Sequence, residues 1–162
     1  MRLEYFQLID RILAVSLEER TIRTEATVPT ESTIFEGHFP GLPLMPGVLL
    51  LEAMAQTAGW LVIALLKFER MPFFIGADRL KLRRFVTPGE HLTGEASLLH
   101  DGSGYAVTRA RLAGDGKPVC EAEIRFRTVP FPNEEFRAHV EAWARQLEFP
   151  LEVTSAANPK LA

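Results

Sequence analysis

Three residues that could do chemistry lie close together in the segment EGHFPGLPLMPGVLLLEAMAQ (36–56): a histidine, a glycine and a glutamate. His38 sits in a loop of glycine and proline that constrains its backbone, and its imidazole can act as a base near neutral pH. Gly47 opens an apolar segment of helical length, so its amide would lie at the positive end of a helix dipole and suit a developing oxyanion. Glu52 follows about one and a half turns later, among apolar side chains where desolvation favours the neutral acid.

A base, an acid and an amide donor together make a set suited to β-elimination. The base would remove the proton next to a thioester carbonyl, the amide would stabilise the enolate-like oxygen, and the acid would protonate the departing hydroxyl group. Gln56, four residues after Glu52, would hold the carboxyl group in place. Each residue also has an ordinary structural explanation: a loop histidine, a paired or exposed glutamate, and a glycine that only marks a helix start. The residues alone therefore indicate a candidate site and leave the reaction open.

These residues need a rigid frame, and the rest of the sequence predicts one. The segment 29–46 contains four prolines and is expected to be a loop, and a helix is expected from Gly47 to about Lys67, with Pro72 marking its exit. Hydrophobic alternation and turn residues predict a short helix within 3–9 and strands at 11–15, 21–28, 73–85, 91–99, 105–112 and 119–128. One long buried helix wrapped by an antiparallel sheet of about six strands is an α+β arrangement, and its open edge favours a dimer.

Composition and charge narrow the class of protein. The 162 residues suit one main domain, 1–129, and the net charge of −3 argues against a nucleic-acid binder. The single cysteine, Cys120, excludes an internal disulfide and suits the cytoplasm, and the N-terminal residues do not resemble a signal peptide. The apolar run 48–66 has the length of a membrane span, but Glu52 and Gln56 fall inside it, which favours a buried helix of a soluble protein.

The C-terminal region departs from the strand pattern. Asn133 is a suitable N-cap, and apolar residues then recur at helical spacing. These residues are Phe136, Val140, Trp143 and Leu147. The segment 130–150 is therefore expected to form an appended helix that packs on the outer face of the sheet or on a partner subunit. A flexible tail is expected at 151–162.

The segment GHFPGLPLMPGVLLLEAMAQTAG (37–59) closely resembles the signature of the 3-hydroxyacyl-acyl-carrier-protein dehydratases of the FabZ type, in the FabA/FabZ family. Supporting matches are LIDRI (8–12), FFIGADRLKLRRFVTPGEHL (73–92) and GKPVCEAEI (116–124), and the resemblance covers residues 5–128. It implies the hot-dog fold, in which an antiparallel sheet wraps a long helix. It also implies a cytoplasmic lyase of lipid metabolism that uses no metal or redox cofactor.

The resemblance also implies roles for the candidate residues. His38 would be the catalytic base, Glu52 the acid, and the Gly47 amide the group that binds the thioester carbonyl. The His38 and Glu52 of one site would come from different subunits of a homodimer, and such dimers can assemble further as trimers of dimers. The implied substrate is a (3R)-hydroxyacyl chain on the phosphopantetheine arm of acyl carrier protein. The implied product is the trans-2-enoyl thioester, in fatty acid or lipid A acyl-chain synthesis.

Two departures and two alternatives bear on this interpretation. A glutamate at position 52, where the sister FabA type has aspartate, predicts dehydration without isomerisation. The segment EYFQLIDR (4–11) and the region after Thr128 depart from the family pattern, which leaves the chain-length preference open. The alternatives are a hot-dog thioesterase and a non-catalytic acyl-binding hot-dog protein. The presence of both His38 and Glu52 favours the dehydratase over either alternative.

A basic run on the expected strand 73–85 predicts a docking surface for the acidic carrier protein. The run consists of Arg79, Lys81, Arg83 and Arg84. Strand alternation places the first three on one face, with Leu80 and Leu82 turned inward. An ordinary solvated strand face explains the same pattern, so the docking surface is one of two interpretations.

An acyl tunnel is expected along the central helix and the sheet. Its candidate lining residues are Leu51, Met54 and Phe85, for each of which core packing is the ordinary alternative. Phe136 and Trp143 of the appended helix are candidates to cap or lengthen this tunnel.

Overall fold

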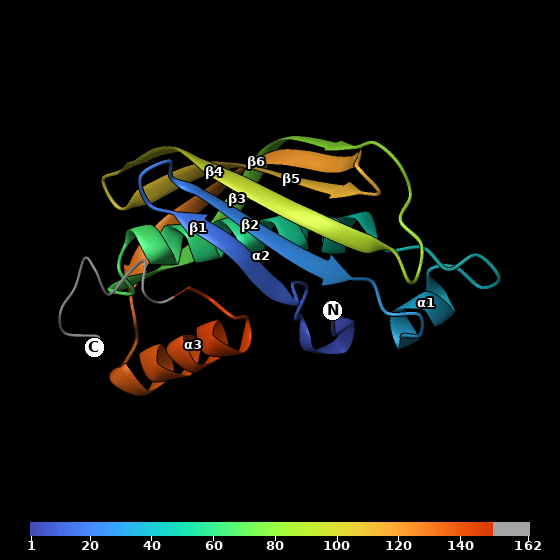
Figure 1. The fold of residues 1–162 in the computed structure, drawn as a ribbon, viewed down its shortest axis with the longest axis horizontal. Coiled ribbons are helices and arrows are strands. Elements are labelled where there is room, and N and C mark those ends of the chain that lie inside the picture. Colours follow the sequence, from blue (N-terminus) through green and yellow to red (C-terminus); the bar gives the residue numbers. More distant parts are fainter. Residues whose placement is uncertain (151–162) are drawn as a thin grey trace.

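Six strands form one antiparallel sheet that wraps around the long helix α2 (Gly47–Leu65) (Figure 1). The computed structural model describes residues 1–150, so the expected tail at 151–162 lies outside the described residues. The strand order is β1-β2-β4-β5-β6-β3. The strands are β1 (Arg11–Ser16), β2 (Thr21–Thr27), β3 (Arg70–Leu82), β4 (His91–Gly102), β5 (Tyr105–Gly114) and β6 (Lys117–Pro130). The other helices are the 3-10 turn η1 (Leu3–Tyr5), α1 (Thr33–Gly37) and α3 (Glu134–Gln146). The predicted α+β arrangement is confirmed.

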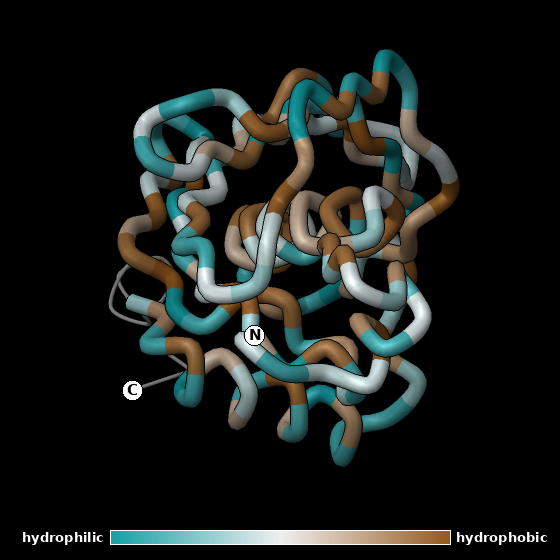
Figure 2. Tube along the Cα trace, turned by 90° about the vertical axis from the view of Figure 1, so that its right-hand side faces the viewer, coloured by the Kyte–Doolittle hydropathy of each residue, from teal (hydrophilic) through white to brown (hydrophobic). Residues whose placement is uncertain are grey.

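Helix α2 forms the core because its sequence is apolar almost all round. Thirteen of its nineteen residues are buried, and Figure 2 shows the helix end-on near the centre of the molecule, with the rest of the chain around it. By length and hydropathy alone this helix is able to cross a membrane, but 72% of the apolar window is buried inside the fold. The helix ends at Leu65, before the predicted end, because Lys67 and Phe68 adopt left-handed backbone conformations.

A glycine lets the sheet approach α2 closely. A Cβ atom at Gly94 of β4 would lie closer than 3.0 Å to the hydroxyl oxygens of Thr24 and Thr57. These buried hydroxyls are 2.9 Å apart, and Thr57 in turn donates to the carbonyl of Ala53 within α2. This satisfied polar contact between β2 and α2 helps to set how the helix is rotated beneath the sheet.

Strand β3 forms one edge of the sheet, and its bounds differ from the prediction. It runs from Arg70 to Leu82 rather than over 73–85, because Pro72 lies inside the strand and not at the exit of the helix. An edge strand tolerates proline, since its missing amide can face away from the neighbouring strand. Large apolar side chains are exposed along this strand: Phe73, Phe74, Ile75, Leu80 and Leu82. The β3 edge therefore carries exposed apolar side chains, and no other described strand pairs with its outer side.

The opposite edge, β1, is partly covered by the chain itself. The amide of Ile12 donates to the carbonyl of Leu147 at 2.8 Å, and Arg11 forms an ion pair with Glu148 at 3.6 Å. Both partners belong to the segment around the end of α3. Within residues 1–150 the two edges of the sheet therefore differ, because β1 is covered by a later segment of the chain and β3 is not.

Helix α3 begins as predicted but packs elsewhere. The side chain of Asn133 caps it by accepting from the amide of Phe136 at 2.7 Å. The helix lies against α2, on the side away from the sheet, and not on the outer face of the sheet (Figure 1). Trp143 meets Trp60 of α2 edge-on, with ring centroids 5.5 Å apart. The expected packing on the outer face of the sheet was wrong, because the sheet covers only one side of α2 and leaves Trp60 to be covered by α3.

The proline-rich segment 29–46 was predicted to be a loop throughout, but it contains the short helix α1. Ser32 caps this short helix by accepting from the amide of Ile34 at 3.1 Å. Glu4 accepts hydrogen bonds from Ser32 and Thr33 at the same end. The hydrogen bond from the Ser32 hydroxyl is the main reason that the pKa of Glu4 is lowered. Helix α1 ends at Gly37, so this capped helix fixes the direction in which the backbone enters position 38.

Candidate active site

His38 follows α1, and its backbone is held on both sides. Its amide donates to the carbonyl of Ile34 at 3.0 Å, and its carbonyl accepts from the amide of Leu44 at 2.9 Å. The ring atom Nδ1 lies 3.0 Å from the carbonyl oxygen of Leu44. Because a carbonyl can only accept, this contact assigns the proton to Nδ1 and leaves Nε2 of the neutral ring free to act as a base.

Gly47 is the first residue of α2. The first hydrogen bond of the helix is donated by the amide of Leu49 to the carbonyl of Pro46 at 3.0 Å. The Gly47 amide precedes that bond and has no acceptor among residues 1–150, so it is available at the positive end of the helix dipole. A Cβ atom at position 47 would lie 2.5 Å from Cδ1 of Leu82, so glycine also lets β3 approach the start of the helix.

His38 and Gly47 line the same cavity, which has a volume of about 400 Å³. Its walls come from the loop after α1, the first turn of α2 and the end of β3. The ring of Phe39 stacks on that of His38 with centroids 4.1 Å apart, and the peptide bond between them is cis. A base and an unpaired helix amide that line one cavity can remove a proton next to a carbonyl and stabilise the resulting oxyanion.

Glu52 is half-buried on α2, and Gln56 holds its carboxylate one turn later. The Nε2 atom of Gln56 donates to Oε1 of Glu52 at 3.0 Å and to the carbonyl of Phe6 at 2.7 Å. The Oε1 atom of Gln56 accepts from the amide of Leu8 at 3.0 Å. One side chain therefore joins the candidate acid to the segment that precedes β1.

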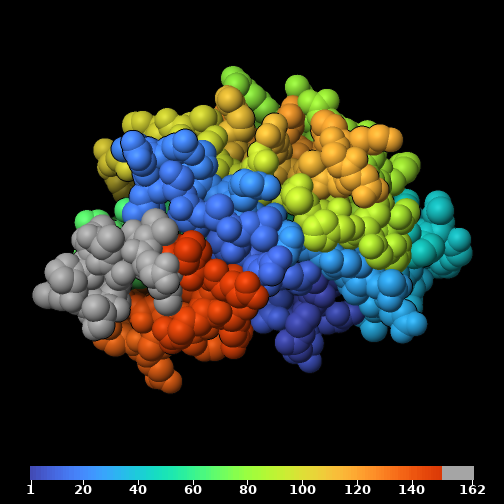
Figure 3. Space-filling view, viewed as in Figure 1, coloured from blue at the N-terminus to red at the C-terminus, as the bar shows by residue number. Residues whose placement is uncertain are grey.

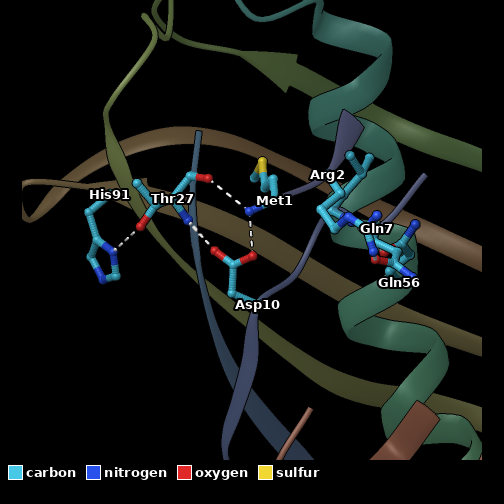
Figure 4. A network of polar contacts seen from close by, with 8 residues as sticks. Met1, Arg2, Gln7, Asp10, Thr27, Gln56 and His91 are labelled. Carbon is cyan, nitrogen blue, oxygen red and sulfur yellow. Dashed lines mark hydrogen bonds and ion pairs between the residues drawn. The ribbon is translucent and has the colours of Figure 1, made fainter. Parts of the chain in front are cut away.

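That N-terminal segment is anchored on its other side by a second set of polar contacts. The amino group of Met1 contacts Asp10 and the carbonyl of Thr27, and the amide of Thr27 donates to Asp10 at 2.7 Å. Figure 4 shows these contacts on one side of the segment and Gln7 and Gln56 on the other. Gln56 therefore reaches backbone that is already fixed, which makes it a firm support for Glu52.

Glu52 lines a second cavity, of about 410 Å³, that shares no lining residue with the cavity of His38. The helix geometry explains the separation. Successive residues are rotated by about 100°, so Glu52 lies about 140° around α2 from Gly47. Within one protomer the candidate base and the candidate acid therefore face different spaces.

The three candidate tunnel residues lie in three different settings. Phe85 lines the cavity of His38 and is exposed over 77% of its surface. Met54 is completely buried in the core, where the sulfur of Cys120 lies 3.8 Å from its own. Leu51 is partly buried against the core and, like Met54, lines neither the cavity of His38 nor that of Glu52.

The basic residues of β3 lie on the outer face of the sheet beside acidic residues of β6. Arg79 pairs with Glu123 at 2.9 Å. Arg83 and Lys81 pair with Glu121 at 2.6 and 3.8 Å. Arg109 of β5 also pairs with Glu123, at 3.2 Å, so four cations share two carboxylates and this face keeps an excess of positive charge. The side chains share one face although the register shifts within this part of the strand.

Arg84, which follows β3, differs from the prediction, and the two leucines of the strand are more exposed than expected. Arg84 does not belong to the basic face, because it forms an ion pair with Glu90 at 2.7 Å and lines the cavity of His38. Leu82 turns inward as predicted and lines the same cavity. Leu80 and Leu82 nevertheless remain 41% and 51% exposed, because none of the residues that the structure describes covers them fully.

Sequence reasoning missed Glu90, which braces one wall of the His38 cavity. Burial acts to raise the pKa of its carboxyl, but hydrogen bonds from the amide of Thr87 and from Arg84 outweigh this and hold the pKa below its usual value. The TPGE sequence (87–90) signals a turn. Only the folded chain shows that the glutamate of this turn meets Arg84.

Sequence reasoning also missed the carbonyl that orients His38 and the N-terminal residues that line the cavity of Glu52. The Leu44 carbonyl sets the tautomer of His38, and a backbone group leaves no mark in the side-chain pattern. Tyr5 and Phe6 line the cavity of Glu52 together with Val140 of α3, across large separations in sequence.

Within residues 1–150, no group of three or more His, Cys, Asp or Glu side chains is placed to hold a metal ion.

Solved structures share this fold at low sequence identity. A thioesterase described as related to phenylacetic acid degradation, from Ralstonia eutropha, superposes with a TM-score of 0.59 at 21% identity, covering 72% of this chain and 82% of its own. A hypothetical thioesterase with coenzyme A, from Streptococcus pneumoniae, gives a TM-score of 0.60 at 16% identity, covering 76% and 88%. At these identities the likeness establishes the hot-dog fold alone.

Comparison of the amino-acid sequence identifies the protein family, which comparison of the fold does not. A curated 3-hydroxyacyl-[acyl-carrier-protein] dehydratase FabZ from Chlamydia pneumoniae is 40% identical over 129 residues, covering 76% of this chain and 83% of the relative. The profile of the FabA-like domain matches residues 2–123, which include the loop of His38 and the whole of α2. The chain therefore belongs to the FabA-like family, as the GHFPG segment and the hot-dog fold together indicate.

Proposed function

We propose that this protein dehydrates (3R)-hydroxyacyl chains carried on acyl carrier protein to trans-2-enoyl thioesters. The observation that carries the proposal is the single cavity lined by both His38, whose Nδ1 is held by the Leu44 carbonyl, and Gly47, the first residue of α2. The relative at 40% identity bears the name of this activity. The enzyme would act in the cytoplasm, in fatty acid or lipid A acyl-chain synthesis.

In the proposed elimination, His38, Gly47 and Glu52 each carry out a different part of the reaction. His38 takes the proton from the carbon next to the thioester carbonyl, and the Gly47 amide stabilises the enolate-like oxygen. The carboxyl of Glu52 then gives its proton to the hydroxyl group on the next carbon, which leaves as water. The carbon–carbon double bond forms as the carbon–oxygen bond breaks, and the proton held by His38 returns Glu52 to its acid form through solvent. No step moves the double bond further, so the reaction ends without isomerisation.

The division of His38 and Glu52 between two cavities supports a site shared by two subunits. The β3 edge is thirteen residues long, open and apolar, and such an edge tends to pair with another chain. A homodimer formed through β3 would cover Leu80, Leu82 and Phe85 beside the cavity of His38. In that dimer the Glu52 that protonates the leaving group is supplied by the partner subunit, and dimers can assemble further as trimers of dimers.

The test is hydration of a trans-2-enoyl thioester, which is the reverse reaction and is followed optically. We expect His38→Ala and Glu52→Gln each to lower kcat by about 10²–10⁴-fold, the usual contribution of a general acid or base. His100→Ala and Glu69→Gln are matched controls, since both residues are exposed and outside the two cavities. Activity retained in both site variants would contradict the assigned roles, and release of free thiol would indicate a thioesterase.

The outer face of β3 is the proposed docking surface for the carrier protein. Arg79 and Lys81 are 74% and 62% exposed, and their face keeps a small positive excess that suits an acidic partner. Exchanging both residues for glutamate should raise KM for carrier-protein substrates more than for short pantetheine thioesters. The same exchange at Arg23, on the far strand β2, is the control. Equal effects on both substrate types would remove the docking surface.

A further inference from the structure

The cavity of Glu52 has a polar end and an apolar remainder. Glu52 is its only charged lining residue, and the hydrogen-bonded Gln56 lies beside it. The rest of the lining is almost entirely aliphatic and aromatic, from α2, the start of β3, β6, the N-terminal segment and α3. A ligand with a reacting polar head at Glu52 and an apolar tail matches this division.

The cavity follows one side of α2. Glu52, Ala55, Gly59 and Ile63 line it on successive turns, so it extends from residue 52 to residue 63, or about 16 Å of helix. Gly59 keeps the middle of this path open, because a Cβ atom there would meet only Cγ of Pro72, at 3.6 Å. The volume of about 410 Å³ is therefore drawn out along the helix, as an extended alkyl chain requires.

Helix α3 supplies a wall of this cavity through Phe136, Val140 and Trp143. The edge-on contact between Trp143 and Trp60 holds the wall against α2. Figure 3 shows α3 and the N-terminal residues next to each other on one face of the molecule. The family profile ends at residue 123, so this wall comes from a part of the chain beyond the family match.

We propose that α3 closes the acyl pocket of this enzyme and sets the length of the acyl chain that it accepts. The inference rests on the proposed function for the identity of the ligand. With the head of the substrate at Glu52, the tail runs along Gly59 and Ile63 and is enclosed by the aromatic side chains of α3. Phe136, Val140 and Trp143 are specificity-determining residues that contact the tail and take no part in proton transfer.

The floor of the cavity favours a substrate chain over a second protein copy as its occupant. Trp60 and Phe126 line it while only 4% and 2% exposed, so the space reaches into the core. A partner subunit has a more accessible apolar surface on the rest of β3, at Ile75, Leu80 and Leu82. The apolar lining that continues from Glu52 past Gly59 to Ile63 suits a single flexible alkyl chain.

Two variants change the pocket in opposite directions. Gly59→Leu puts a side chain into the middle of the path, and leucine is also the better helix former at that position. Phe136→Ala removes part of the wall, and because Phe136 is 40% exposed the fold loses little packing. Leu147→Ala is the matched control, since Leu147 follows α3 and is buried in the core without lining the cavity. Gly59→Ala, whose Cβ makes only an ordinary contact, serves if leucine prevents folding.

The measured quantity is the ratio of kcat/KM for a 3-hydroxytetradecanoyl thioester to kcat/KM for a 3-hydroxybutanoyl thioester. Excluding even one methylene from an apolar pocket changes kcat/KM by about 10–200-fold. We expect Gly59→Leu to lower the ratio by at least about tenfold, with the short substrate little affected. Phe136→Ala should raise the ratio, and Leu147→Ala should leave it unchanged while lowering Tm. An unchanged ratio in Gly59→Leu and Phe136→Ala, whether or not the dimer weakens, would overturn the proposal.

A binding measurement separates this inference from the proposed reaction. Calorimetry with saturated tetradecanoyl- and butanoyl-pantetheine needs no turnover. If the protein binds the longer thioester more tightly and Gly59→Leu abolishes the difference, the pocket stands even where no dehydration is detected. If dehydration is detected but Gly59→Leu binds both thioesters as the unaltered protein does, the pocket is wrong and the reaction stands.

Discussion

Replacing Gln56 with methionine tests whether this residue positions Glu52. The change keeps the length of the side chain and removes three hydrogen bonds, to the amide of Leu8, the carbonyl of Phe6 and the carboxylate of Glu52. Each of the three hydrogen bonds contributes about 1 kcal/mol net. The free energy of unfolding should fall by about 3 kcal/mol, which corresponds to a decrease in Tm of about 6–12 °C in a chain of this size.

The kinetic effect of the same change should be larger than the loss of stability explains. Without Gln56 the carboxyl of Glu52 can rotate, and a displacement of about 1 Å at a catalytic group can lower the rate by about 10²-fold. We expect kcat for hydration of a trans-2-enoyl thioester to fall by about 10–100-fold. KM should change little, because Gln56 supports the acid and does not carry the thioester.

Thr57→Val is the matched control for this experiment. Thr57 is the neighbouring residue on α2, is completely buried and hydrogen-bonds toward the sheet through Thr24. Its replacement also removes hydrogen bonds at nearly constant volume, but it leaves Gln56 and Glu52 untouched. Equal values of kcat in the Gln56→Met and Thr57→Val variants, measured below both Tm values, would refute the positioning role of Gln56.

Three further predictions concern the fold around the site. Burial raises the pKa of the Cys120 thiol to about 12, so a thiol reagent at pH 8 should label the folded protein only as fast as the protein opens; rapid labelling without denaturant would contradict this. Glu90 has a folded pKa below its unfolded value of about 4.5, so its stabilising effect is present above that pH and is lost as the pH falls through the folded pKa. Glu90→Gln should therefore lower Tm at pH 7 by weakening the contacts with Thr87 and Arg84, and the difference from the unaltered protein should shrink in acid; a difference independent of pH would contradict the assignment. Gly94→Ala should lower the free energy of unfolding by about 1–3 kcal/mol in urea titrations, because the added methyl group overpacks the contact with α2; unchanged stability would show that the sheet moves away freely.

The central helix and the strand pattern were predictable because their signals are local. An apolar run longer than most strands is typical of a buried helix, and the start at Gly47 follows from the prolines that precede it. The spacing of Glu52 and Gln56 places them on one helix face in any fold. The residue types indicated a set suited to β-elimination, but only the family resemblance assigned the reaction, the substrate and the sharing of the site between two subunits.

The elements that were mispredicted depend on distant parts of the chain. Pro72 is a helix-exit signal in sequence, but it is tolerated in β3 because that strand lies at the sheet edge. The apolar stripe of α3 shows that the helix is covered on one side without showing by what, and Trp60 of α2 provides that surface. The tautomer of His38 depends on the Leu44 carbonyl, whose direction follows from the backbone path of the loop.

Mixing two inactive variants tests most directly whether the active site is shared between subunits. His38→Ala and Glu52→Gln homodimers each lack one group in both sites, but a mixed dimer contains one complete site. When the two kinds of subunit combine at random, about half of the dimers are mixed, and each mixed dimer has one complete site of two. An equal mixture should therefore regain about one quarter of the activity of the unaltered enzyme. If unfolding and refolding the variants together restores no activity beyond that of the separate variants, although mixed dimers are detected by mass, His38 and Glu52 do not meet across a dimer interface.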